Sequence, residues 1–176
     1  MLSGERGLGK FTTINHLMHF YFDRSNYDEI NFLFKEDTSF HIQNSENIFP
    51  NLLHLEGLDS KNIKIADIRK LKQDLLKKPI NDQKRFIILD DVELFNHNSL
   101  NALLKIIEEP SKRDYFILIN NQTKTLIDTI KSRSIEFKVI LNESERINII
   151  NKLIKLNSIN VILNPSDSKL APGKFI

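Results

Sequence analysis

Short apolar runs recur along the chain and predict the strands of a buried sheet. Residues 52–55, 86–89 and 115–119 are almost entirely apolar, and residues 134–139 form a weaker run of the same kind. Runs of this length without polar alternation are typical of strands that are covered on both faces of a parallel sheet.

Helical periodicity separates these runs. Apolar residues are spaced three and four apart in two stretches, which are Ile68, Leu71 and Leu75 ahead of Pro79, and then Leu100, Leu103, Leu104 and Ile107. A last helix is predicted at residues 143–156, whereas residues 23–50 are polar with scattered aromatics and fit no element. Strands that alternate with helices predict an α/β fold, with helices flanking a parallel sheet.

The composition is that of an ordinary folded protein, with 40% hydrophobic and 27% charged residues in a chain of 176. This length is enough for one core with a small appendage. The absence of cysteine excludes disulfides, thiol catalysis and cysteine-based zinc sites. No stretch approaches the roughly 18 apolar residues that span a bilayer, so we expect a cytoplasmic protein without a membrane partner.

Charge is unevenly distributed. The chain carries a net +2, yet residues 61–85 hold nine basic side chains against three Asp, which makes this segment +6 and the remainder −4. The nine are Lys61, Lys64, Arg69, Lys70, Lys72, Lys77, Lys78, Lys84 and Arg85. Either contact with nucleic-acid phosphates or a solvated helix face explains this segment.

The first ten residues carry a phosphate-loop spacing. Gly4, Gly7, Gly9 and Lys10 fit GxxxxGK, in which backbone N–H groups surround phosphates and the lysine reaches the outer ones. The alternative is a glycine-rich turn before a helix. The next residue is Phe11 instead of the Ser or Thr that ligates magnesium, and a helix turns the following side chain by about 100°. We therefore expect that ATP, with its magnesium, binds at most to a degenerate site.

A second anchor is the pair of acids that follows the run at residues 86–89. Asp90 would face the magnesium, and Asp91 stands where an active ATPase of this kind usually has Glu, one methylene longer. Ligands bind at the carboxyl ends of strands in open α/β sheets. The alternative is a strand that ends in solvated acids.

Residues 101–110, NALLKIIEEP, resemble the NALLKxLEEP helix of bacterial DNA polymerase III clamp-loader subunits. Residues 116–121 are similar to that family's sensor strand, which makes Asn120 and Asn121 nucleotide-binding candidates. Residues 129–134 resemble its TIxSRC segment, and the similarity covers roughly residues 2–140. The resemblance implies an AAA+ core at 1–140 and the start of a helical lid at 141–176.

The resemblance also implies roles. Arg133 matches the arginine that reaches a neighbouring subunit's ATP, with Asp90 and Asp91 at the catalytic acid positions; an ordinary surface arginine is the alternative. Phe11 and Asp91 favour the delta-prime type, which hydrolyses little or no ATP itself while serving the polymerase holoenzyme. Implied partners are the gamma/tau and delta subunits, the sliding clamp and primer-template DNA. An ATP-hydrolysing gamma/tau-type subunit, a phosphate-loop small-molecule kinase and a plain DNA-binding module stay open.

Two further expectations concern what this chain lacks. Most members of that family carry a four-cysteine zinc module where residues 23–50 lie here, so we expect no zinc. His16, His19 and His41 are too irregularly spaced to replace it. Three residues before Gly4 are also short for a buried strand, so we expect that sequence is missing at both ends and that the isolated chain is poorly stable.

Overall fold

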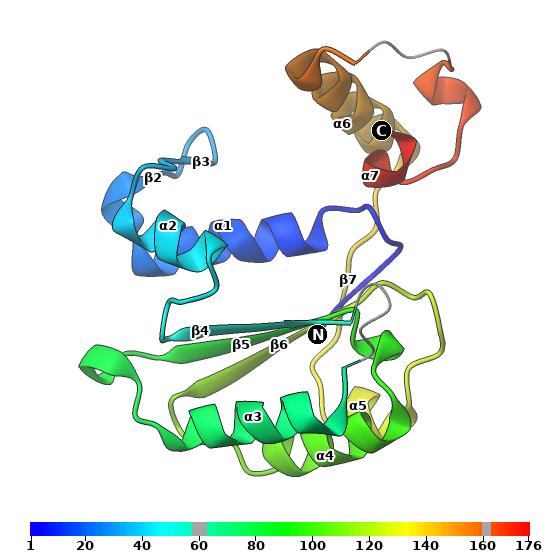
Figure 1. The fold of residues 1–176 in the computed structure, drawn as a ribbon. Coiled ribbons are helices and arrows are strands. Elements are labelled where there is room, and N and C mark those ends of the chain that lie inside the picture. Colours follow the sequence, from blue (N-terminus) through cyan, green and yellow to red (C-terminus); the bar gives the residue numbers. More distant parts are fainter. Residues whose placement is uncertain (58–62, 160–162) are drawn as a thin grey trace.

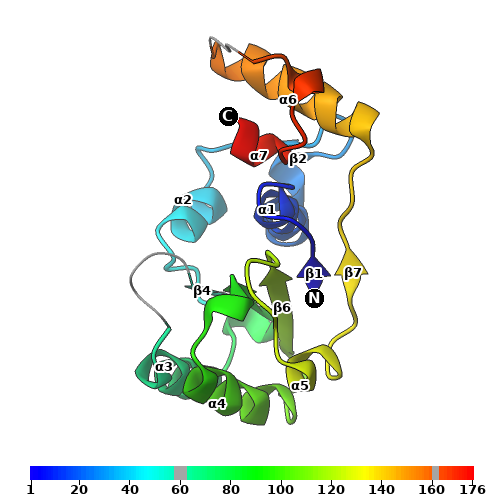
Figure 2. The same cartoon turned by 90° about the vertical axis from the view of Figure 1, so that its right-hand side faces the viewer.

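The computed structural model describes residues 1–57, 63–159 and 163–176, and its centre is a parallel five-stranded sheet (Figures 1 and 2). The strand order is β4-β5-β6-β1-β7. These strands are β1 (Leu2–Ser3), β4 (Leu52–Glu56), β5 (Arg85–Asp90), β6 (Asp114–Asn120) and β7 (Phe137–Lys138). The predicted α/β fold and the four predicted strands are confirmed.

Helices cover both faces of the sheet (Figure 1). One face packs against α3 (Ile65–Leu76), α4 (His97–Ile107) and α5 (Asp128–Lys131), and the other against α1 (Lys10–Phe22) and α2 (Ser39–Ser45). Beyond α1 lie α6 (Glu143–Asn157) and α7 (Pro172–Phe175). Short 3₁₀ turns occur at Arg24–Asn26, Ile80–Asp82, Val92–Leu94 and Pro165–Asp167. No helix within the described ranges is long and apolar enough to cross a bilayer.

The apolar runs sort into two cores because side chains alternate along a strand. On β5, Ile87 and Leu89 join the cluster under α3 and α4, while Ile88 joins the cluster under α1. All three side chains are at most 3% exposed. A central strand buried on both faces explains why this run shows no polar alternation.

Helix starts are set by polar caps. The side chain of Asn96 accepts a hydrogen bond from Ser99 N at the start of α4, and Asn142 and Glu145 form a capping box at the start of α6. Such caps satisfy backbone donors that have no partner within the helix. The helix predicted at residues 143–156 is therefore confirmed, with α6 ending at Asn157.

The first strand is as short as the sequence indicated. β1 pairs with Ile119 and Asn120 of β6 and with β7 on its other side. The Met1 amino group donates a hydrogen bond to Ile135 O at 2.7 Å. β1 thus places the phosphate loop directly after the sheet's carboxyl edge.

Residues 23–50, which fitted no predicted element, form an ordered layer on α1. The antiparallel strands β2 (Tyr27–Asp28) and β3 (Leu33–Phe34) lead into α2, which Thr38 caps. The ring of Phe34 stacks on His19 with centroids 3.8 Å apart. Ring contacts between residues that are distant in sequence stabilise this layer. A local periodicity cannot predict such contacts.

The structure corrects one expectation for the basic segment at residues 61–85, because Arg85 is buried and does not contribute to a basic surface. Its side chain is 4% exposed and forms an ion pair with the equally buried Asp114 at 2.8 Å. Its remaining donors reach the backbone carbonyls of Asp74, Leu75 and Lys77 at the end of α3. Arg85 therefore caps a helix inside the protein, and Lys61 lies outside the described residues.

Candidate functional site

Three strand ends meet at one edge of the sheet and define the candidate site. The loop of residues 4–9 follows β1, Asp91 follows β5, and Asn121 follows β6. Because β1, β6 and β5 are parallel neighbours, their carboxyl ends lie side by side. The structure thus brings the predicted loop, acids and amide together around a pocket of about 250 Å³.

The loop conformation depends on glycine at two positions. Gly7 and Gly9 have φ values of 93° and 79°, in the left-handed region that favours glycine. Gly4 N donates a hydrogen bond to Asn120 O at 3.1 Å, which ties the loop's start to β6. The chain then enters α1 at Lys10.

The lysine of the loop is turned onto the loop itself. Lys10 is 3% exposed, and its Nζ donates hydrogen bonds to Gly4 O and Glu5 O, both at 2.8 Å. Burial lowers the pKa of the Lys10 ammonium, and the nearby carboxylates oppose this shift. The ammonium stabilises the loop through the same N–H donors that would bind a phosphate.

Asp91 is a fully buried carboxylate with a partner on each oxygen. Arg6 Nη2 lies 2.6 Å from Oδ2, and Asn121 Nδ2 donates a hydrogen bond to Oδ1 at 2.8 Å. The Asp91 backbone is in the left-handed region, with φ 51°. Arg6 was not among the predicted site residues, although an arginine inside a phosphate loop was visible in the sequence.

Asp90 stands beside this ion pair and is less well compensated. Its Oδ1 accepts hydrogen bonds from Asp91 N at 2.7 Å and from Asn121 Nδ2 at 3.3 Å. Burial raises the pKa of the Asp90 carboxyl to about 6, the neighbouring carboxylates of Asp91 and Glu56 add to the shift, and Lys10 opposes it.

Of the two sensor candidates, the side chain of Asn121 reaches the acids. Asn120 is buried, and its Oδ1 accepts a hydrogen bond from Gln122 N at 3.0 Å, so this amide orders the turn after β6. The sequence offered two adjacent asparagines, and alternation along the strand sends them in different directions.

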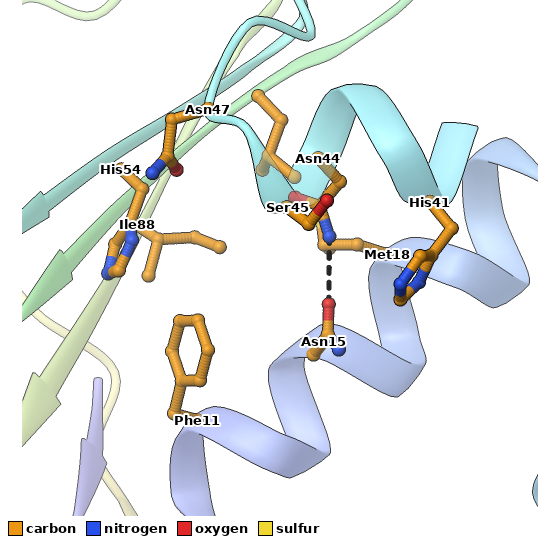
Figure 3. A pocket seen from close by; sticks show the side chains of 10 residues that line it. Phe11, Asn15, Met18, His41, Asn44, Ser45, Asn47, His54 and Ile88 are labelled. Atoms are coloured by element: carbon orange, nitrogen blue, oxygen red, sulfur yellow. Dashed lines mark hydrogen bonds between the residues drawn. The ribbon is translucent and has the colours of Figure 1, made fainter. Parts of the chain in front are cut away.

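Phe11 fills the position where a magnesium-ligating hydroxyl would stand. Its ring stacks on His54 with centroids 4.9 Å apart and faces a hollow of about 270 Å³ between α1 and α2 (Figure 3). An Asn44–Asn15 hydrogen bond of 2.9 Å crosses the far side of that hollow (Figure 3). Thr12 lines the loop pocket but is exposed.

These groups offer a magnesium ion few oxygen ligands, chiefly Oδ2 of Asp90. Magnesium requires near-octahedral oxygen ligands, usually one or two carboxylates with a hydroxyl and phosphate oxygens. Both oxygens of Asp91 are bonded, Asp90 already accepts two hydrogen bonds on Oδ1, and Phe11 supplies no oxygen.

Arg133 lies apart from this pocket, at the far end of α4. Its Nη2 is 2.7 Å from Glu108 Oε1, and its Nη1 donates a hydrogen bond to Thr129 O at 3.1 Å. The side chain is 40% exposed. Arg133 also lines an apolar groove of about 660 Å³ with Ile107, Pro110 and residues 114–118. A guanidinium here does not contact its own loop and is accessible to another molecule.

The sequence matches the family model described as DNA polymerase III, delta subunit, over residues 1–143. The chain belongs to this family.

Curated relatives include both types of clamp-loader subunit. A delta-prime subunit of DNA polymerase III from Bacillus subtilis is 37% identical over 81 residues, covering 46% of this chain and 25% of that protein. A gamma subunit from Buchnera aphidicola is 31% identical over 93 residues, covering 52% and 26%. The chain thus spans about a quarter of the length of these relatives.

Solved structures share the fold. A gamma subunit-related protein from Thermotoga maritima superposes with a TM-score of 0.59 at 22% identity, covering 89% of this chain and 47% of that one. A RuvB mutant from the same organism gives 0.52 at 17% identity, covering 90% and 44%. These likenesses confirm the predicted fold class, a parallel sheet flanked by helices.

In this family member, α7 docks directly on the phosphate loop, a contact that the sequence did not reveal. Gly173 N donates a hydrogen bond to Gly7 O at 2.9 Å, and Lys174 Nζ lies 3.0 Å from Glu5 Oε1. A Cβ on Gly173 would lie 3.1 Å from Gly7 Cα, so the close approach depends on glycine. The division into domains at residue 140 stays a prediction.

The histidines that looked scattered in the sequence are neighbours in space. His41 Nδ1 and His19 Nε2 are 3.4 Å apart, and the rings of both His16 and His19 contact Phe34. Across residues 1–57, 63–159 and 163–176, no group of three or more His, Cys, Asp or Glu is arranged to hold a metal. His16 and His19 lie on α1 and His41 lies on α2, and the packing of the two helices brings them together although their spacing is irregular.

We predict that Arg6→Ala lowers the free energy of unfolding by about 2 kcal/mol, because it leaves the buried Asp91 charge without its cation. Adding Asp91→Asn should recover most of this loss, since the neutral amide needs no cation. Urea denaturation of the single and double variants measures both effects. The matched control is Arg24→Ala, whose ion pair with Glu29 is well exposed and should change stability by about 0.5 kcal/mol or less. An equal effect of the two arginines would contradict the role of Arg6.

We predict that stability falls as the pH drops below neutral because His19 is buried. Burial, with a smaller contribution from His41, lowers the pKa of His19 to about 4. The unfolded chain, with a pKa of about 6.5, therefore takes up the proton first, and His19 alone lowers the free energy of unfolding by about 2 kcal/mol between pH 7 and pH 5. The raised pKa of Asp90 offsets part of this loss in the parent protein. Urea titrations at both pH values should show that lowering the pH destabilises the parent protein by about 2 kcal/mol more than it destabilises His19→Phe. Equal losses would exclude His19 as the source.

Proposed function

We propose that this chain is a delta-prime-type clamp-loader subunit that supplies Arg133 to the nucleotide of a neighbouring subunit and hydrolyses little or no ATP itself. The observation that carries the proposal is that both carboxylate oxygens of Asp91 already have partners. Its two oxygens bind Arg6 and Asn121, so the acid that would position an attacking water is already neutralised. The gamma/tau-type alternative requires this acid to be free.

The state of the loop supports the same assignment. Lys10 is bonded to the loop's own carbonyls, and Phe11 packs its ring on His54 where a metal ligand would stand. ATP binding to this loop, without a magnesium ion held by the protein, is the most that this arrangement accommodates. A small-molecule kinase would need the same magnesium, so the geometry disfavours that alternative also.

Arg133 has the properties that a trans-acting arginine needs. A guanidinium stays charged at any physiological pH and binds phosphate oxygens in a fork geometry. In phosphoryl transfer such a group stabilises the charge that develops on the phosphates. Its 40% exposure and its place beside an apolar groove make it available to a docked subunit.

The proposed partners are the gamma/tau and delta subunits, the sliding clamp and primer-template DNA. For DNA, a groove of about 370 Å³ between α3 and α4 is lined by Arg69, Lys72 and Lys105 together with the amides of Asn98 and Asn101. Cations and amides spaced along two helices fit a phosphate backbone. Arg85 is buried, and Arg69 and Lys72 are the residues of the basic segment that line this groove.

The arginine role is tested by ATP hydrolysis in the assembled clamp loader, stimulated by clamp and DNA. Arg133→Ala should lower turnover by at least about tenfold, because a neighbouring transition state loses its cation. Lys10→Ala, in this chain only, should leave turnover unchanged. The reverse pattern, in which Lys10→Ala abolishes turnover and Arg133→Ala does not, would identify the chain as an ATP-hydrolysing subunit.

The DNA contact is tested by charge reversal in the groove. Lys72→Glu and Lys105→Glu should each weaken binding of primer-template DNA by the assembled complex and reduce the salt slope of log K by about 1. Lys152→Glu, on an exposed position of α6, is the matched control and should leave the slope unchanged. Three equal slopes would show that the groove does not contact the DNA backbone.

A further inference from the structure

Glu108 occupies an electrostatically unfavourable place for a carboxylate. It is the C-terminal cap of α4, and Glu109 follows it directly. The C-terminal end of a helix carries partial negative charge, which favours cations and disfavours two adjacent acids. The neighbouring cation that compensates Glu108 is Arg133, at 2.7 Å.

Stability does not account for this ion pair. The Glu108 and Arg133 side chains are 45% and 40% exposed, and pairs with this access to water contribute little to folding. Glu108 opposes the helix dipole, and its ion pair with Arg133 adds little stability. The position in which it holds the Arg133 side chain explains its presence better.

The contacts fix the direction of the guanidinium. Nη2 meets Glu108 at the end of α4, and Nη1 donates a hydrogen bond to Thr129 O in α5. Both helices contribute buried side chains to one core, including Leu103 from α4 and Ile130 from α5. Because a guanidinium has five N–H donors in one plane, these two bonds orient the plane and leave donors for phosphate oxygens.

We propose that Glu108 is the positioning residue for Arg133, and that it holds the guanidinium outward for the phosphates of a neighbouring subunit's nucleotide. The inference rests on the proposed function of Arg133. Without Glu108, the long arginine side chain samples many rotamers, and the transition state must order it. The loss should therefore appear in kcat, while ground-state binding of ATP changes little.

The test compares Glu108→Gln with Glu109→Gln, its exposed sequence neighbour, in the assembled clamp loader with clamp and primer-template DNA. Glu108→Gln keeps the shape and removes the charge. It should lower kcat for ATP hydrolysis by about fivefold with the KM for ATP unchanged. Glu109→Gln should leave both constants at the parent values. Glu108→Asp, which keeps the charge on a shorter side chain, should recover part of the loss.

A third arm separates positioning from a general structural effect. In an Arg133→Ala background, Glu108→Gln should cause no further loss, because the residue it positions is absent. A loss in that background, equal losses in the Glu108 and Glu109 variants, or a rise in kcat in Glu108→Gln would each overturn the inference. A rise would mean that Glu108 withholds the arginine.

The same data distinguish this inference from the function on which it rests. If Arg133→Ala itself leaves turnover unchanged, the arginine role fails. If Arg133→Ala lowers turnover and Glu108→Gln behaves as Glu109→Gln does, the arginine role stands and the positioning role fails. Size-exclusion chromatography of each complex confirms that the compared variants assemble equally.

Discussion

The buried carboxylate of Asp91 is the constraint around which this end of the molecule is arranged. A charge removed from water needs a partner of opposite sign and hydrogen bonds on its remaining lone pairs. Arg6 comes from the loop after β1, and Asn121 comes from the end of β6. One side chain directly after β5 therefore joins the three strand ends that meet at the sheet's carboxyl edge.

Contacts from side chains and from α7 hold the phosphate loop in place. Lys10 satisfies carbonyls of its own loop, Arg6 turns toward Asp91, and Gly173 of α7 donates a hydrogen bond to Gly7 O. In a working nucleotide site the phosphates and the metal supply such contacts. Here side chains and a helix end make contacts of this kind with the loop.

The elements that the sequence predicted well are those whose signal is local. Strand runs such as residues 86–89 and the periodicity of α4 depend on near neighbours, and both appear where expected. The loop spacing up to Lys10 is equally local. The groups that complete the site are separated by long stretches of chain, as Arg6 and Asp91 are by 85 positions, and no periodicity reports such a pair.

The errors have the same physical origin. Arg85 counted as surface charge because neither its burial nor its ion pair with Asp114 can be read from the surrounding lysines. The contact between the His19 and His41 rings, 22 positions apart, likewise depends on how α1 and α2 pack and shows in no local pattern. The layer at residues 23–50 was missed because ring stacking against α1 stabilises it.

Helix α4 connects the candidate site around Asp91 to the Glu108–Arg133 ion pair. The chain leaves Asp91 through the buried turn Val92–Leu94, enters α4, and reaches Glu108 at its far end. Eleven helical residues span about 16 Å, and packing of the helix against the core keeps that distance fixed. Asp91 and the Glu108 partner of Arg133 are therefore connected through one packed helix. Under the proposed function this fixed placement matters, because a trans-acting arginine depends on its position relative to the neighbouring subunit's nucleotide.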